Sequence, residues 1–148
     1  MARKALLFSN AEEAKILNVL GERIAVLVGD SHDSGHEVVL HIGAEGAGPP
    51  PHFHPWDEDF YVVDGEIDFT VDGRDYTLAR GGFVHIPAGT PHSFRHKTAQ
   101  GRALGVNAPG GAIAFYTAID GLGDGPLNME KLFAIARECQ VGYAGPPI

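Results

Sequence analysis

The sequence predicts an all-β protein, folded as a sandwich or barrel of short strands. Of its 148 residues, 20 are glycine and 10 are proline, and no single run contains most of them. This composition is typical of a chain with many turns. Turn signals recur roughly every 8–12 residues and separate short apolar or alternating stretches. With 44% apolar residues the chain can form a folded core, and its length fits one domain over residues 1–148.

The individual strands are predicted from runs rich in Val, Ile, Leu, Phe and Tyr. Residues 9–20 indicate a helical turn, with Ser9 as its cap and Glu12 three residues later, and then a strand that Gly21 ends. Asp72-Gly73 between two alternating stretches is the strongest hairpin signal. The further strands that we expect are 23–28, 36–42, 59–64, 66–71, 75–79, 83–86, 92–96, 102–107 and 112–117.

One amphipathic helix is predicted near the C-terminus, over about residues 128–140, with Asn128 as its cap. Its apolar residues follow the spacing i, i+3, i+4, i+7 and are Met129, Leu132, Phe133 and Ala136. A single apolar stripe of this kind packs on a core and carries no chemistry. We expect it to cover a β core formed by about residues 21–118.

Charge and cysteine content exclude several classes of partner and location. Lys and Arg number 11 and Asp and Glu number 19, giving a net charge of −8, which argues against nucleic acid and anionic membranes. No stretch approaches the ~20 apolar residues of a membrane span, and the apolar run 5–8 is too short for a signal peptide. The single cysteine, Cys139, cannot form an intrachain disulfide. We therefore expect a cytoplasmic protein.

The histidines point to a metal site. His52 and His54 are two residues apart, so in a strand they project to the same side with Cα atoms roughly 6.5 Å apart. Two imidazoles at this spacing can reach one ion, and Glu58 follows four residues later. His92 begins a separate predicted strand. Three nitrogens and one oxygen would leave open positions on a metal that prefers five or six ligands.

Glycines and prolines stand at fixed offsets around these residues, and this pattern resembles the cupin superfamily. The two segments are Gly46-x5-His52-x-His54-x3-Glu58-x6-Gly65 and Gly81-x5-Pro87-x-Gly89-x2-His92-x3-His96. They are similar to the two cupin motifs almost position for position. The wider sequence resembles the small bacterial cupins that are similar to quercetin dioxygenase.

The resemblance implies a double-stranded β-helix (jelly-roll) barrel with a short C-terminal helix. It implies that His52, His54, Glu58 and His92 bind one divalent transition metal ion, which could be Fe, Mn, Ni or Zn. It also suggests that Glu58 is a general base that takes a proton from a substrate hydroxyl. The second motif usually ends in Asn, and this position is His96 here, which could line the pocket or make the hydrogen bond of the Asn.

Strand alternation predicts a largely apolar pocket around the metal and a second apolar face outside it. The expected pocket residues are Phe60, Val62, Phe69, Phe94 and His96. Such a pocket favours a small neutral aromatic or aliphatic substrate over a sugar phosphate. Tyr61 and Val63 face the opposite way, so we expect a homodimer or a second layer to cover them. His41 is a weaker pocket candidate, and His85 is expected to face outward.

Three functions remain open at this point. The first is a metal-dependent dioxygenase, an oxidoreductase acting on a small apolar or aromatic molecule. The second is a metal-dependent isomerase or hydrolase that uses the ion as a Lewis acid. The third is a small-molecule-binding protein without turnover.

Overall fold

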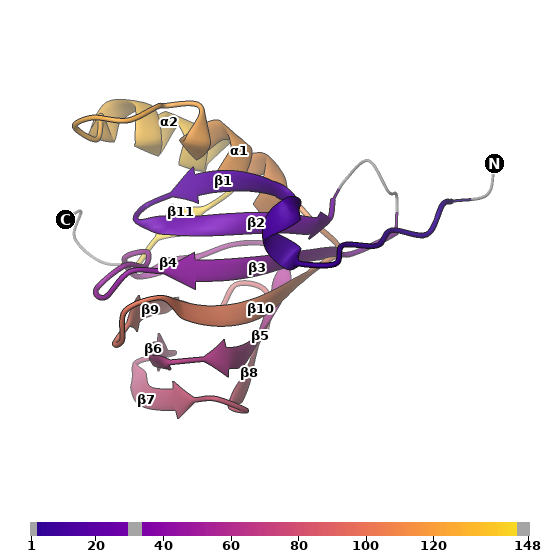
Figure 1. The fold of residues 1–148 in the computed structure, drawn as a ribbon. Coiled ribbons are helices and arrows are strands. Elements are labelled where there is room, and N and C mark those ends of the chain that lie inside the picture. The colour runs from indigo at the N-terminus through magenta and orange to yellow at the C-terminus, as the bar shows by residue number, and fades with distance from the viewer. Residues whose placement is uncertain (1–2, 30–33, 145–148) are drawn as a thin grey trace.

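The computed structural model describes residues 3–29 and 34–144, and its strands form two antiparallel sheets that face each other (Figure 1). The six-stranded sheet has the order β1 (Lys15–Val19), β2 (Glu22–Val28), β3 (Glu37–Gly43), β10 (Gly101–Ala108), β5 (Asp57–Asp64), β8 (Phe83–Ile86). The five-stranded sheet has the order β11 (Gly142–Tyr143), β4 (His52–Phe53), β9 (His92–His96), β6 (Glu66–Val71), β7 (Arg74–Ala79). Within the described residues no strand pairing joins the two sheets. The predicted all-β jelly roll is thus confirmed, as two facing sheets rather than a closed barrel.

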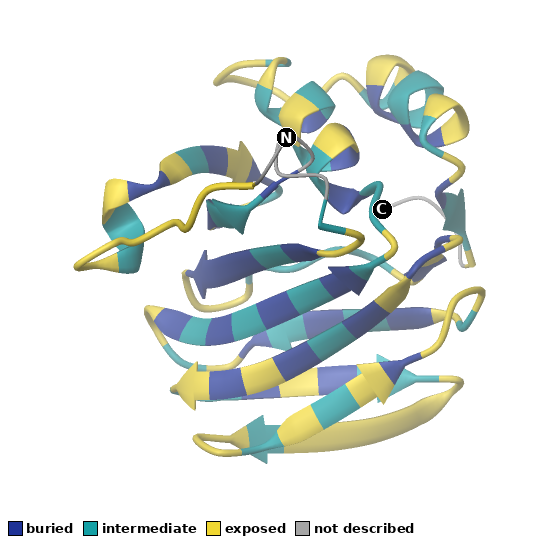
Figure 2. Ribbon diagram, turned by 90° about the vertical axis from the view of Figure 1, so that its right-hand side faces the viewer, coloured by how far each residue is buried: buried dark blue, intermediate teal, exposed yellow. Residues whose placement is uncertain are grey.

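The strands that carry the site alternate between buried and outward residues, in β5 as far as Val63, and Figure 2 shows such alternation in colour. On β9, His92, Phe94 and His96 are buried. On β5, Glu58, Phe60 and Val62 are buried in the same way. Because strand side chains point to opposite faces in turn, each set projects into the space between the sheets. The predicted facing of both strands is confirmed.

The hairpin between β6 and β7 turns at the predicted Asp72-Gly73 pair. Both residues have positive φ, 50° for Asp72 and 79° for Gly73, as a two-residue turn between twisted strands requires. Val71 then pairs with Arg74 across the hairpin. At the N-terminal end the helical turn η1 (Ala11–Glu13) is capped by Asn10, which accepts from the Glu12 N–H, and not by Ser9 as predicted.

The strand predicted over 112–117 is wrong, because this segment forms helix α1 (Ala112–Asp120). Its buried residues, Ala112, Phe115 and Ile119, follow a helical and not a strand period. The Glu37 carboxylate of β3 accepts from the N–H groups of Ala112 and Ile113 at 3.0 and 3.2 Å, which satisfies two N-terminal helix donors. A side chain 75 residues earlier in the chain therefore stabilises the start of this helix.

The predicted C-terminal helix is confirmed as α2 (Met129–Glu138). Asn128 caps it by accepting from the Lys131 N–H, and Leu132 and Ala136 are buried. The two helices lie at the end of the sheets beside β1 (Figure 1). Their apolar residues join those of β1, β2 and β3 in one core cluster. Cys139, at the end of α2, is half-buried.

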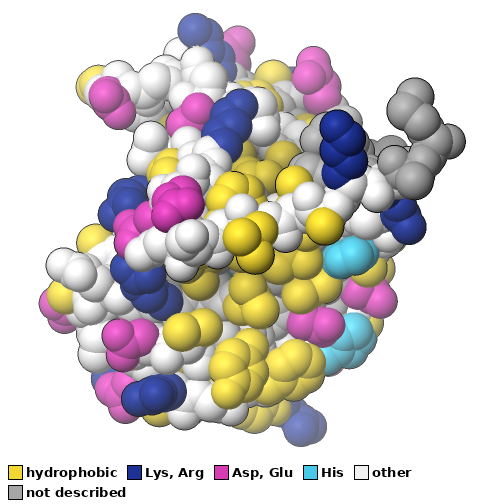
Figure 3. Space-filling model, turned by 45° about the vertical axis from the view of Figure 1, so that its right-hand side comes forward, with side chains coloured by type: hydrophobic (Ala, Val, Ile, Leu, Met, Phe, Trp, Pro, Cys, Tyr) yellow, Lys and Arg dark blue, Asp and Glu magenta, His cyan; other side chains and the backbone are white. Residues whose placement is uncertain are grey.

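The outer face of β5 carries exposed apolar side chains. Tyr61 is 48% and Val63 is 41% exposed, so no part of the described chain covers them. Phe83, opposite Tyr61 on β8, is 58% exposed. The space-filling view in Figure 3 shows hydrophobic side chains gathered on one face of the molecule. His85 on β8 is exposed as predicted, and its Nδ1 lies 2.5 Å from Asp59 Oδ1. A homodimer that covers the Tyr61 face stays a prediction.

Candidate functional site

Three histidines meet where the ends of two strands lie side by side. His52 on β4 pairs directly with His92 on β9, and His54 follows one residue after β4 ends. One ring nitrogen from each residue lies within 4.8 Å of the other two. All three side chains are buried. The spacing that predicted a shared site thus places His52, His54 and His92 around one point.

Backbone carbonyls fix the orientation of all three rings. His52 Nδ1 donates to the Pro50 carbonyl at 2.8 Å, and His92 Nδ1 donates to the Thr90 carbonyl at 2.8 Å. His54 Nδ1 donates to the Trp56 carbonyl at 3.0 Å. In each neutral ring the proton is therefore on Nδ1, and the lone pair of Nε2 is free to bind a metal. The indole of Trp56 stacks on His54 with ring centroids 4.3 Å apart and further restrains that ring.

Glu58 completes the group from the neighbouring strand of the other sheet. Its Oε1 lies 3.2 Å from His92 Nε2 and 3.4 Å from His54 Nε2. The carboxylate is only 3% exposed. A carboxylate oxygen and a bare imidazole nitrogen both carry lone pairs, so a proton or a cation must lie between them. Three nitrogens and one carboxylate are ligands that divalent transition metals bind, and the residues present fit such an ion.

Electrostatics keep the group ready to bind a cation. Burial, with the neighbouring His92, lowers the pKa of His52 to about 3, so His52 is neutral near pH 7. Burial alone would raise the pKa of Glu58, but a proton held on Nε2 of His54 or His92 outweighs this and lowers it. The Tyr116 hydroxyl on α1 lies 3.4 Å from Glu58 Oε2. Burial and the negative charge of Glu58 raise the pKa of Tyr116, so its hydroxyl stays protonated and donates.

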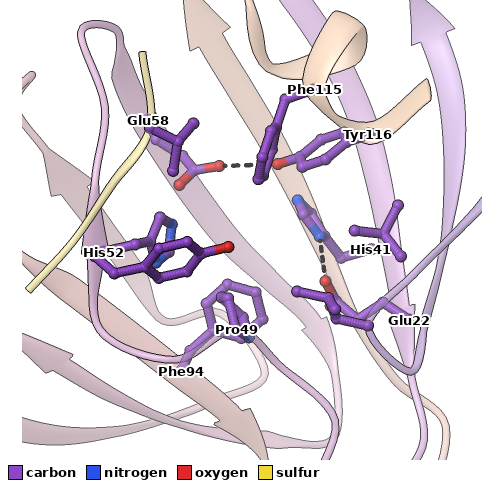
Figure 4. Close-up of a pocket in the computed structure, with 12 residues that line it drawn as sticks. Glu22, His41, Pro49, His52, Glu58, Phe94, Phe115 and Tyr116 are labelled. Atoms are coloured by element: carbon purple, nitrogen blue, oxygen red, sulfur yellow. Dashed lines mark hydrogen bonds and ion pairs between the residues drawn. The ribbon is translucent and has the colours of Figure 1, made fainter. Parts of the chain in front are cut away.

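A cavity opens beside this cluster, and Figure 4 shows His52 and Glu58 on one side of it and Glu22 and His41 on the other. Its space, including the open mouth, is about 450 Å³. The lining residues come from both sheets, helix α1 and the C-terminal segment: Val19, Leu20, Glu22, His41, Pro49, His52, Glu58, Phe94, Phe115, Tyr116, Val141 and Tyr143.

The structure distributes the predicted pocket residues between the cavity and the core. Phe94 lines the cavity. Phe60, Val62 and Phe69 lie with Phe94 in a separate core cluster and are not among the lining residues. His96 is 1% exposed and donates to Glu22 instead of lining the cavity.

Sequence reasoning did not identify Glu22 or Tyr116 as site residues. Glu22 is the first residue of β2 and is followed by the exposed Arg23, so the local sequence is that of an ordinary polar strand end and does not reveal that Glu22 is buried. Tyr116 was assigned to a strand, where its facing could not be predicted. The spacing of Ala112, Phe115 and Ile119 could have identified the helix that carries it.

Comparison with known proteins agrees with this fold. Residues 38–106 match the family model described as Cupin domain. The chain is 33% identical over 104 residues to quercetin 2,3-dioxygenase of Bacillus subtilis, a match that covers 68% of this chain and 31% of the relative. It is 39% identical over 56 residues to an uncharacterized protein of Streptomyces coelicolor, covering 38% of this chain and 53% of that protein. The chain thus spans about a third to a half of the length of these curated relatives.

Solved structures share the same architecture. An RmlC-like cupin from Shewanella frigidimarina has a TM-score of 0.63 at 24% identity, covering 74% of this chain and 96% of that one. KdgF from a Halomonas species has a TM-score of 0.63 at 20% identity over 72% of this chain and 96% of its own. The polyketide cyclase RemF from Streptomyces resistomycificus has a TM-score of 0.62 at 23% identity over 72% and 81%. These structures show that the chain has the cupin fold. The family match over residues 38–106 shows that it contains a cupin domain.

Among the described residues, no helix is long and apolar enough to cross a bilayer.

Proposed function

We propose that the chain is a metal-dependent dioxygenase that acts on a small, largely apolar or aromatic substrate. The observation that carries this proposal is the orientation of His52, His54 and His92. Each ring donates Nδ1–H to a backbone carbonyl and presents Nε2 to a common point beside a buried carboxylate. The likeness to quercetin 2,3-dioxygenase supports the choice of reaction class.

The proposed ligands of the ion are His52, His54, His92 and Glu58. A divalent transition metal held by these residues would supply Lewis acidity to a substrate oxygen. The backbone carbonyls that hold the three rings preset their geometry, so little ordering remains when the ion binds. Glu58 is buried beside the three rings, and its carboxylate can accept a hydrogen bond from a substrate hydroxyl. Tyr116 donates to the other oxygen of that carboxylate and holds it in place.

The wall of the cavity supports a neutral substrate. Two carboxylates, Glu22 and Glu58, line it, and none of the described residues that line it is Lys or Arg. A phosphate or a polycarboxylate would find no Lys or Arg among these described residues to pair with. Half of the lining residues are apolar, among them Phe94, Phe115 and Pro49. A small ring with one or more oxygen functions fits this mixture.

Metal analysis of protein purified without chelators tests the proposal first. We expect one equivalent of a transition metal in the wild type and in His85→Ala, a control that removes an exposed histidine. His92→Ala should lose the metal. Oxygen consumption is then measured with flavonols and other enolisable compounds. A metal-free wild type would refute the proposal.

The other two candidate functions are outcomes of the same experiment. Turnover of a compound without oxygen consumption would indicate an isomerase or hydrolase that uses the ion as a Lewis acid. Tight binding without any turnover would indicate a binding protein.

A further inference from the structure

A second polar cluster lies in the cavity, across from the histidines of the candidate metal site. The Glu22 carboxylate on β2 accepts from His41 Nδ1 at 3.0 Å and from His96 Nε2 at 2.7 Å. His41 lies on β3 and His96 on β9, so the cluster joins both sheets. Glu22 is 4% exposed, and the two histidines are each 1% exposed. Three ionisable side chains are rarely buried together unless they have a role.

Glycines without side chains provide the space that the Glu22, His41 and His96 cluster occupies. Glu22 pairs with Gly43 on β3, and Gly43 pairs with Gly101 on β10, so the three form one row across the sheet. The His96 ring lies over this row. A Cβ atom at Gly43 would lie 2.0 Å from His96 Cδ2, and one at Gly101 would lie 2.6 Å from His96 Nδ1. Neither glycine has positive φ, so the ring and not the backbone conformation requires them.

His41 is the member of the cluster that can meet a ligand. It lines the cavity, and its Nδ1 is occupied by Glu22. Its Nε2 is buried and has no hydrogen-bond partner among the described residues. Figure 4 shows the ring between Glu22 and Tyr116, with the second nitrogen pointing away from the Glu22 carboxylate. A Cβ at Gly105 would lie 2.9 Å from Nε2, so this glycine also makes room for the ring.

A positive charge on the His41 ring would make its Nε2 a hydrogen-bond donor. Burial alone would lower the pKa of His41, but the charge of Glu22 and its hydrogen bond outweigh this and raise it. Glu58, across the cavity, acts in the same direction. Burial would raise the pKa of Glu22, and the two histidines outweigh it and lower it. The hydrogen bond to Glu22 and the raised pKa favour the protonated form of His41, whose N–H on Nε2 has no acceptor among the described residues.

We propose that His41 is the ligand-binding group on the wall opposite the metal site, and that its Nε2–H binds an oxygen atom of the substrate. Glu22 and His96 are positioning residues that hold the ring. The substrate is then a small neutral molecule with oxygen functions at both ends, one directed to the metal and one to His41. This inference rests on the proposed function, because the metal fixes the near end of the ligand.

The proposed role of His41 is tested by the binding of two matched ligands to the zinc-loaded protein. Tropolone has two adjacent oxygens that chelate a metal, and 5-hydroxytropolone adds a hydroxyl at the opposite end of the ring. We expect the wild type to prefer 5-hydroxytropolone by about tenfold or more in calorimetric titrations, because a hydrogen bond to a charged group contributes that much. In His41→Leu the preference should fall to within about twofold. Glu22→Gln should reduce it in part, since the ring loses its charge.

A second measurement is independent of whether these variants fold. In wild-type protein with ¹⁵N-labelled histidine, 5-hydroxytropolone should shift the His41 Nε2 resonance and tropolone should not.

His85→Gln is the matched control and should keep the wild-type preference, because His85 is exposed on β8. Equal affinities for the two probes in the wild type, or an unchanged preference in a folded His41→Leu, would overturn this inference alone. Loss of zinc binding by the wild type would overturn the proposed function and this inference with it.

Discussion

Replacing Gly101 by alanine should destabilise the protein, although alanine is ordinarily neutral or favourable at a strand position with negative φ. The added Cβ would lie 2.6 Å from His96 Nδ1, and ordinary contact begins near 3.4 Å. The ring would therefore have to move by about 0.8 Å, taking 2.6 from 3.4. It cannot move toward β3, because it already lies against the backbone of Gly43. Any other movement stretches its 2.7 Å bond to Glu22.

The expected loss of stability follows from these two contacts. Overpacking a core costs about 1–3 kcal/mol. Weakening a hydrogen bond to a buried carboxylate costs part of a further ~1.5–3 kcal/mol. We expect the free energy of unfolding to fall by about 2–4 kcal/mol and the Tm by about 5–15 °C. Urea denaturation followed by circular dichroism measures the former directly.

The matched control is Gly121→Ala at the end of α1. Gly121 has φ of −65°, and its nearest atoms are at 3.4 and 3.5 Å. Alanine there should leave stability within about 0.5–1 kcal/mol of the wild type. In a His96→Ser background, which removes the ring, Gly101→Ala should cost less than about 1 kcal/mol. If Gly101→Ala is as stable as the wild type, or costs the same without the ring, the packing argument is wrong.

Three further predictions concern the metal site and the outer face. Addition of Ni²⁺ should change the fluorescence emission of Trp56, the one tryptophan in the chain, because its ring stacks on His54 with centroids 4.3 Å apart. The change should be complete at one equivalent of Ni²⁺. It should be absent in His92→Ala. In metal-free protein, burial and His92 lower the pKa of His52 to about 3 from 6.5, so the unfolded chain takes up the proton first as pH falls. Stability should then decline between pH 6.5 and 3 by on the order of 5 kcal/mol, and urea titrations of His52→Gln should show a flatter decline. Tyr61→Lys should convert a homodimer to a monomer in sedimentation equilibrium, and a monomeric wild type would contradict the predicted dimer.

The period of two along a strand made much of the site predictable. Once Glu58 or His92 is assumed to face inward, alternation fixes the facing of every second residue of β5 and β9. Alternation does not fix whether an inward-facing residue lies on the wall of the cavity or in the core. Phe60 and Phe69 face inward as predicted, yet they pack in the core and not on the wall of the cavity. Which end of a strand lies beside the cavity depends on the packing of other segments, here α1 and the C-terminal residues.

Long-range contacts explain why the sequence did not predict helix α1 or the contact between Glu22 and His96. The segment 112–120 is rich in apolar and aromatic residues, which suit a buried strand as well as a helix. Its helical start depends on Glu37, whose carboxylate comes from β3. Glu22 and His96 are 74 residues apart, and only the facing of the two sheets brings them together. No local pattern could predict that His96, in the place of the usual Asn, has a carboxylate partner.

The two buried carboxylates of the cavity show why a metal is expected on one side only. Each needs a positive partner, because an unpaired charge is expensive to bury. Glu22 has one within the chain, since the Nδ1–H of His41 donates to it and the ring carries the charge. Glu58 faces rings whose Nδ1 protons are committed to backbone carbonyls, so they offer it lone pairs. The first cluster is complete as folded, whereas the second is completed by a cation, and a ligand between them would meet a donor at one end and a metal at the other.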